Sequence, residues 1–535
     1  MTSPPPDAAD PAERPWLPRA ALAALALATL AGFLVYPTYP NYDSYYSLLW
    51  GRELLHLQAP SFETYYAPTQ HPLAVAFGAL LSLLGRGADR VMVFCTMVSF
   101  VVLVAGLYRV GRLLFTPAVG IAAGLILCTR LDFPFLAARA YIDIPYLALI
   151  VWAVALAIKE PFARTKASPS SNARAQPEHD WRVWALLLAA GLLRPEAWLL
   201  LGFYGAWLAW CSWRDSGSAT AAAATLVRAA AISAIAPGIW MLTDLLVTGD
   251  PLFSLTHTSS FAEELGRTKG AGEIPSAMRA FFFNLTKAPV MAAGLVGGVL
   301  AFWFVPRRAL LPAVLWLIGS GTFVLVGLAG LSVIDRYLLV PALMVMLFAA
   351  VTVAGWTLLE RSWLRTAWMA LAVLGVAYGV LFTVLRVNPN VLTSELERRG
   401  ASHRALVELL DRPAFDSACV PYSVPNHKLV PEVRWVADLG EPDVLARTAA
   451  QGAGDRSLSD DERAARRATR ARLRGDGTAL YVVERGTILK QAIVSDRDSE
   501  FNNIPVYVDD LPAPGAWKRL EVNDYYSAYA RCLSR

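Results

Sequence analysis

Eleven apolar runs constrain this chain more than any other feature of its sequence. An upright membrane-spanning helix needs about 20 apolar residues. Several runs are shorter, so their ends are approximate, and the segment 183–210 fits either one long span or two. The composition, 56% hydrophobic and 17% charged, exceeds the apolar fraction of soluble domains. We therefore predict a mainly α, polytopic membrane bundle of about eleven spans, at 20–36, 91–108, 118–135, 144–158, 183–193, 195–210, 229–247, 288–305, 309–331, 337–359 and 367–385.

The lysines and arginines between the runs set the expected orientation, because cytoplasmic loops carry an excess of positive charge. The apolar segment 71–85 must not cross the bilayer if these basic connections are to share one side, so we interpret it as an interfacial helix on the outer surface. No small-residue cleavage site follows the first run, which we interpret as a retained helix. The N-terminus is then expected in the cytoplasm of a plasma-membrane protein, together with Arg109 and Arg112, the segment 159–182, Arg214 and Arg228, Arg307 and Arg308, and Arg361 and Arg365.

The apolar pattern divides the chain into two predicted domains. Residues 1–387 form the membrane domain, and its first extracytoplasmic loop is 37–90. Residues 388–535 lose the apolar pattern and are predicted to form a polar domain of mixed helices and strands. An odd number of spans places this second domain outside the cell.

Local signals predict two elements of the polar domain. Ser459 and Glu462 match a capping box, and Gly475 is placed to end the same helix. The arginines of this helix fit a solvated face, with polyanion binding as the alternative. The segment 479–483 is predicted to be a strand.

Five cysteines are present, and none has the spacing of a metal site. Cys419 and Cys532 both lie in the polar domain. They can form a disulfide if that domain is extracytoplasmic, although the sequence does not supply the required geometry.

Ionisable residues gather on the predicted outer side of the membrane. Asp43 comes directly after the first apolar run, where it is either a solvated loop acid or part of a site. Arg139 and Asp143 are four residues apart and would share a helix face, so an ion pair between them is as acceptable as a site role. Arg194 and Glu196 are two apart, so a regular helix would direct them to different partners.

Arginines on this outer side suit a phosphate ligand, since guanidinium binds phosphate oxygens bidentately. Snorkelling to the membrane surface and pairing within the protein are the alternatives. His56 and His71 show neither an HExxH nor an HxxxH pattern, so no metal site is assigned and a divalent cation stays open. Nothing in the sequence points to nucleic acid.

Several short motifs occur in order along residues 17–386, and in this order they resemble the GT-C superfamily of integral-membrane glycosyltransferases. Protein O-mannosyltransferases and lipid A aminoarabinose transferases are the most similar families. The first-loop acid is followed by Ser44, where protein O-mannosyltransferases carry an Asp-Glu pair, which weakens assignment to that subfamily. The motifs are Tyr42-Asp43-Ser44-Tyr45-Tyr46, His71-Pro72, the segments 109–115, 139–145 and 191–196, and Arg336-Tyr337-Leu338-Leu339.

The resemblance implies a polyprenyl-phosphate-linked sugar as donor and an inverting transfer to an envelope glycan, lipid or protein at the extracytoplasmic membrane face. It implies that Asp43 is the general base, which takes the proton of the acceptor hydroxyl. Arg336 is the first candidate to bind the donor phosphate, Arg194 is the second, and Arg139 is a further candidate. No cofactor is implied. Further substrate-binding candidates on the same face are Tyr42, Arg52, His56, His71, Asp143, Glu196, Asp250, His257 and Tyr337.

Two other function classes fit the apolar pattern. A transporter or lipid flippase also has many spans with intramembrane charge, although the chain shows no internal repeat. A noncatalytic envelope assembly protein with the same scaffold is the second alternative. Convergence of Asp43, Arg194 and Arg336 in space is the observation that favours the enzyme.

Overall fold

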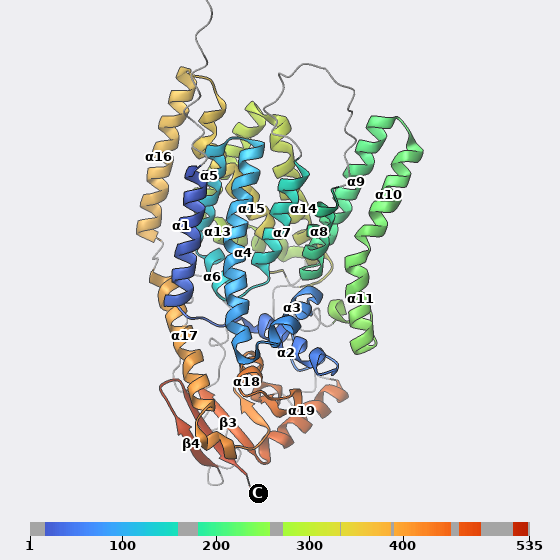
Figure 1. Cartoon of the computed structure of the whole chain (residues 1–535), viewed down its shortest axis with the longest axis vertical. Helices are drawn as coiled ribbons and strands as arrows, with labels where there is room; N and C mark the ends of the chain where they lie inside the picture. Colours follow the sequence, from blue (N-terminus) through green and yellow to red (C-terminus); the bar gives the residue numbers. More distant parts are fainter. Residues whose placement is uncertain are drawn as a thin grey trace, which may run out of the picture.

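The computed structural model describes the chain as a helical bundle with a smaller α/β domain at one end (Figure 1). His257, one of the substrate-binding candidates, lies outside the described residues. The described residues are 16–158, 180–256, 271–331, 333–386, 390–450, 459–482 and 517–532.

Every predicted apolar run is mostly helical where the structure describes it, although the run 118–135 is broken between Cys128 and Asp132. The predicted fold class, a polytopic membrane bundle with a terminal mixed α/β domain, is confirmed. The helices of the bundle are α1 (Trp16–Val35), α4 (Ala88–Leu114), α5 (Pro117–Cys128), α6 (Asp132–Ala138), α7 (Asp143–Ala157), α8 (Trp181–Leu193), α9 (Glu196–Ser216), α10 (Ala219–Ser233), α11 (Ile235–Thr248), α13 (Ile274–Phe304), α14 (Pro306–Leu328), α15 (Leu339–Ala354) and α16 (Trp363–Arg386).

The number of spans stays a prediction. Among the described residues, seven helices are long and apolar enough to cross a membrane, or eight if the bent pair α5 and α6 counts as one span. The segment 183–210 is not one long helix, because α8 ends at Leu193, Arg194 has an extended backbone, and α9 begins at Glu196. Proline at position 195 favours a break there, since it disfavours a helical conformation in the residue before it.

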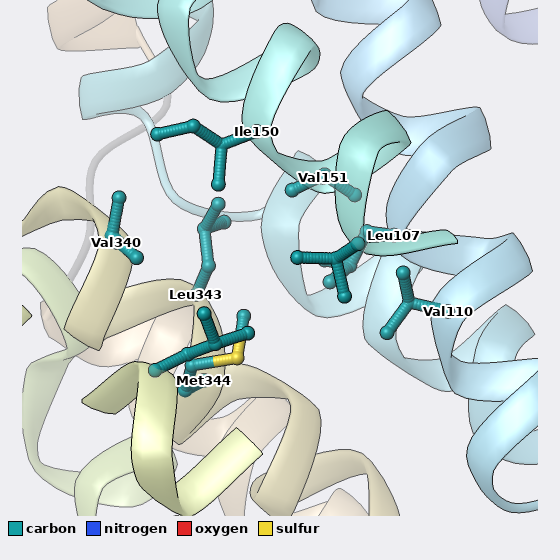
Figure 2. Close-up of a pocket in the computed structure, with 9 residues that line it drawn as sticks. Leu107, Val110, Ile150, Val151, Val340, Leu343 and Met344 are labelled. Carbon is teal, nitrogen blue, oxygen red and sulfur yellow. The ribbon is translucent and has the colours of Figure 1, made fainter. Parts of the chain in front are cut away.

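The bundle core forms around α15, whose residues are nearly all buried. Gly294 and Gly297 of α13 leave no room for a Cβ against the backbone of α15, so these two helices approach closely. Small residues at helix contacts are the usual basis of close packing in membranes. A purely apolar pocket lies between α4, α7, α14 and α15 (Figure 2), lined by Leu107, Val110, Ile150, Val151, Val154, Leu315, Val340, Leu343 and Met344.

Two short helices, α2 (Tyr42–Leu55) and α3 (Pro72–Ser82), lie between the bundle and the C-terminal domain (Figure 1). They cross closely, because a Cβ on Gly51 or on Gly78 would collide with the backbone of the other helix. With 11 residues, α3 rises only about 16 Å and is too short to cross a bilayer upright. Its length agrees with the non-crossing interpretation of 71–85.

In the described part of the C-terminal domain, five strands form a sheet of order β2-β1-β3-β5-β4. β1 pairs in parallel with β2 and β3, whereas β5 pairs antiparallel with β3 and β4. Its elements are α17 (Asn390–Leu410), β1 (Tyr422–Val424), η6 (His427–Leu429), α18 (Val430–Val436), β2 (Val444–Ala446), α19 (Asp460–Arg474), β3 (Gly477–Val482), β4 (Lys518–Val522) and β5 (Tyr526–Arg531).

The local predictions for this domain are confirmed. Ser459 caps α19 in a capping box with Glu462, and Gly475 is the C-cap. The strand predicted at 479–483 matches β3 over residues 479–482, and residue 483 lies outside the described residues. Cys419 and Cys532 form a disulfide with an S–S distance of 2.01 Å.

The C-terminal domain is fixed to α2 by charged contacts. Arg434 of α18 donates from Nη2 to Glu53 Oε1 at 2.6 Å, and both side chains are buried. Arg52 Nη1 contacts Asp438 Oδ1 at 2.5 Å, and Arg52 Nη2 donates to the carbonyl of Leu439 at 3.1 Å. The domain therefore covers the side of α2 that faces away from the bundle.

Candidate active site

The start of α2 is anchored to the connection between α6 and α7. Asn41 caps the helix, since its side chain accepts a hydrogen bond from the Ser44 backbone N–H at 3.1 Å. The Asn41 backbone N–H donates to the Arg139 carbonyl at 2.8 Å, and Ser44 Oγ donates to the Ala140 carbonyl at 2.6 Å. These bonds place Asp43, in the first turn of α2, beside the start of α7.

Arg336 joins two carboxylates from different parts of the chain. It lies in the short 3-10 helix η3 (Asp335–Leu338), and its Nη1 is 3.4 Å from Asp43 Oδ2 and 3.4 Å from Asp143 Oδ2. The side chains of Asp43 and Arg336 are 21% and 22% exposed, whereas that of Asp143 is fully buried. The accessible end of this network is therefore the Asp43–Arg336 contact.

Arg194 forms the buried end of the same network. Its Nη1 pairs with Asp143 Oδ1, and its Nη2 pairs with Glu196 Oε1 at 2.6 Å. The guanidinium carbon lies 5.6 Å and 5.5 Å from the ring centres of Tyr146 and Tyr337. Asp143 thus holds two arginines, and Arg194 is surrounded by carboxylates and rings.

Asp43, Arg194 and Arg336 therefore converge, together with Asp143 and Glu196, although they come from α2, η3, the start of α7 and the break between α8 and α9. We call these five residues the charge network. These residues are paired with one another and are not solvated loop side chains.

Two expectations that assumed a regular helix were wrong, and both errors have the same cause. Arg194 and Glu196 do face each other, because the extended backbone at Arg194 ends the helical geometry that would separate them. Arg139 and Asp143 do not share a helix face. Arg139 follows the end of α6, Asp143 begins α7, and Ala140 between them has a φ of 54°.

Arg139 is buried, and its guanidinium carbon lies 4.0 Å from the ring centre of Tyr39. Its carbonyl accepts the hydrogen bonds of Asn41 at the start of α2. This position makes Arg139 an anchor for the helix that carries Asp43. A direct contact of Arg139 with donor phosphate stays a prediction.

His71 precedes α3 and borders the charge network. Its ring lies 5.7 Å from that of Trp240 in an edge-to-face arrangement. Burial lowers the pKa of His71 to about 4, so the imidazole is neutral near pH 7. Its Nδ1 is a buried atom without a hydrogen-bond partner among the described residues.

The other candidates have local partners. The Tyr42 hydroxyl donates to the Tyr66 carbonyl, and burial raises the pKa of Tyr42. Arg52 contacts the C-terminal domain, as described above. His56 is exposed at the end of α2, and Asp250 accepts a hydrogen bond from the backbone N–H of Leu252 at 2.9 Å in the turn after α11. The contacts given above for Arg52, His56 and Asp250 are with residues outside the charge network.

The buried pair Glu53–Arg434 was not predicted from the sequence, because its members lie 381 residues apart and neither belongs to a recognisable motif. The described residues contain no group of three or more His, Cys, Asp or Glu side chains that would hold a metal ion.

No protein-family model and no curated protein matches the sequence. Two solved structures of ArnT from Cupriavidus metallidurans match along nearly their whole length. The complex with undecaprenyl phosphate has a TM-score of 0.52 at 12% identity, covering 96% of this chain and 98% of that chain. The apo structure has a TM-score of 0.50 at 14% identity, covering 98% and 99%. ArnT is a GT-C glycosyltransferase, so the protein described here has the GT-C fold.

Proposed function

We propose that the protein is an inverting glycosyltransferase that moves a sugar from a polyprenyl-phosphate donor to a cell-envelope acceptor. The observation that carries this proposal is the partly exposed contact between Asp43 and Arg336, backed by the buried Asp143 and Arg194. The GT-C fold supports it, since the matching ArnT structure is bound to undecaprenyl phosphate. The polyprenyl phosphate and the acceptor hydroxyl would meet at this contact.

Asp43 is the proposed general base. Its carboxylate takes the proton of the acceptor hydroxyl as the acceptor oxygen forms a bond to the anomeric carbon. The bond between that carbon and the phosphate oxygen breaks, and its electron pair leaves with the polyprenyl phosphate. The leaving phosphate is already an anion, so the step needs no second catalytic acid.

Arg336 is the proposed phosphate ligand. Its two carboxylate contacts are long, at 3.4 Å each, and its side chain is partly exposed, so its guanidinium is available to a phosphate. Arg194 is nearly covered and already pairs with Asp143 and Glu196. Its role is therefore to hold Asp143 and, through Asp143, the position of Arg336.

The proposed reaction takes place on the extracytoplasmic face. The first loop and the C-terminal domain lie at the same end of the bundle (Figure 1). The disulfide Cys419–Cys532 supports an oxidising compartment for that end, because disulfides persist outside the cytoplasm. The positively charged connections are predicted at the opposite, cytoplasmic end.

The test uses membranes containing the full-length protein and a panel of labelled polyprenyl-phosphate sugars. Asp43→Asn keeps the shape of the side chain but cannot accept the proton, so we expect transfer to fall by about 100- to 10,000-fold. The matched control is Glu63→Gln, which removes an exposed acid of the same loop. Transfer by Asp43→Asn at the wild-type rate would exclude Asp43 as the base.

The same labelled polyprenyl-phosphate sugars distinguish a transporter from a glycosyltransferase. Reconstituted wild-type protein that moves a labelled polyprenyl-phosphate sugar across the bilayer without forming a covalent product would contradict the glycosyltransferase proposal. The gathering of the charge network at one end of the bundle favours transfer at one face.

A further inference from the structure

Four aromatic rings gather at the seam between the first loop and the C-terminal domain. The Tyr66 ring centre lies 4.1 Å from that of Tyr65 and 4.7 Å from that of His427. Tyr42 meets His427 edge to face at 5.6 Å. We call Tyr42, Tyr65, Tyr66 and His427 the aromatic patch.

The aromatic patch begins one residue from the proposed base. From Asn41 to Gly51, only Tyr42 and Asp43 are partly exposed, and the other residues of this stretch are buried. Tyr65 and Tyr66 are also partly exposed. The accessible edge of α2 therefore presents a carboxylate beside aromatic rings.

The patch is held in place from both sides of the seam. The Tyr42 hydroxyl donates to the Tyr66 carbonyl, which fixes the first-loop rings relative to α2. On the other side, Asn426 accepts a hydrogen bond from the Lys428 backbone N–H at 3.0 Å and so caps the helix that carries His427. The buried pair Glu53–Arg434 joins the two domains nearby.

The patch is not the interior of one core. Tyr42 packs against the first-loop core around Trp50 and Phe62, whereas Tyr65 packs against the core of the C-terminal domain. Tyr42, Tyr65 and Tyr66 keep exposed edges, whereas His427 is buried behind them at 8% exposure. Such an arrangement, with aromatic faces and a few polar tips, is typical of sites for small organic ligands.

We propose that the aromatic patch binds a pyranose ring. A pyranose has a C–H face that packs on aromatic rings and hydroxyl groups that can meet the oxygens of exposed tyrosines. This inference rests on the proposed glycosyl transfer, and it gives the C-terminal domain a part in sugar recognition through His427, whose buried ring positions Tyr42 and Tyr66. Two sources carry this chemistry, namely the sugar of the lipid-linked donor and a glycan acceptor.

The experiment measures binding and transfer by full-length Tyr65→Ala and His427→Ala proteins in nanodiscs. The binding probes are bare undecaprenyl phosphate and undecaprenyl phosphate carrying glucose, mannose, galactose or N-acetylglucosamine. An aromatic contact contributes about 0.5–1.5 kcal/mol, so each variant should lose roughly 2- to 10-fold in sugar recognition. Bare undecaprenyl phosphate should bind each variant as it binds the wild type.

The source of the sugar follows from which quantity changes. If the alanine variants bind the sugar-bearing donor more weakly but bind bare undecaprenyl phosphate as the wild type does, the patch binds the donor sugar. Unchanged donor binding with a higher KM for the acceptor, measured by diluting acceptor membranes with empty liposomes, assigns it to an acceptor glycan.

Matched variants separate recognition from folding. Tyr65→Phe and His427→Phe keep an aromatic ring and should retain most of the binding. Tyr529→Ala removes a partly exposed ring elsewhere in the sheet and should change neither donor binding nor the acceptor KM. The inference is overturned if Tyr65→Ala and His427→Ala behave like the wild type, or if they weaken bare undecaprenyl phosphate equally. Wild-type protein that neither binds nor transfers any probe would instead overturn the proposed function, and this inference with it.

Discussion

At the scale of single residues, Asp143 organises the candidate site. It is completely buried, and two arginines from distant segments share its carboxylate. A buried charge is costly unless it is paired, so the two arginines must remain close to each other despite their like charge. Asp143 therefore helps to hold Arg336 beside Asp43, where its side chain is partly exposed.

The residue-scale prediction concerns Arg336. Arg336→Ala removes the proposed charge-assisted contact with the donor phosphate, so the KM for the polyprenyl-phosphate sugar should rise by about 10- to 100-fold. Arg336→Lys keeps the positive charge but lacks the planar guanidinium, so its donor KM should lie between those of the wild type and Arg336→Ala. Steady-state transfer at varied donor concentration measures the effect. A fall in kcat with an unchanged donor KM would contradict the assignment of Arg336 to the phosphate.

At the scale of elements, α2 connects the two domains. Its first turn carries Asp43, and its last turn carries Glu53, which pairs with Arg434 of the C-terminal domain. Glu53 also accepts hydrogen bonds from the backbone N–H and the hydroxyl of Ser61 at 2.8 Å and 3.0 Å. Close contact through Gly51 and Gly78 fixes the same helix against α3.

The element-scale prediction is a double-mutant test of this connection. Arg434→Met leaves the Glu53 carboxylate buried without its charged partner and should destabilise the protein by about 3–5 kcal/mol. Adding Glu53→Gln removes that charge, while the amide oxygen still accepts from Ser61, so most of the loss should be recovered. Thermal unfolding in nanodiscs measures both variants. Equal melting temperatures for the single and double variants would show that the buried charge is not the cause.

At the scale of the whole molecule, α17 joins the domains. Its first half packs against the bundle core through Leu396, and its second half packs against the C-terminal core through Leu406 and Leu409. The C-terminal domain is therefore not tethered by a linker alone but continues the packing of the bundle (Figure 1). Its disulfide closes a segment of 113 residues.

The whole-molecule prediction concerns that disulfide. In membranes prepared with thiols blocked, Cys419 and Cys532 should be protected from alkylation until a reductant is added. Cys419→Ser should lower stability by about 2–4 kcal/mol, since a cross-link restricts the unfolded chain. Cys211→Ser, at a half-buried free cysteine, is the control. Reduced cysteines at both positions in cells would contradict the extracytoplasmic placement of the domain.

The sequence alone determined the helical segments, the polar C-terminal region and a set of charged residues between the apolar runs, because apolar runs, caps and glycines act locally. It identified Asp43, Arg194 and Arg336 as a group, but it placed Arg139 and Asp143 on one helix face and separated Arg194 from Glu196. Only the tertiary structure decided those contacts, since they depend on helix breaks at Arg194 and Ala140 and on segments far apart in the chain. It also decided that Glu53 meets Arg434 and that His427 joins the first-loop tyrosines. Such long-range contacts follow from how the helices pack, which no periodicity in the sequence encodes.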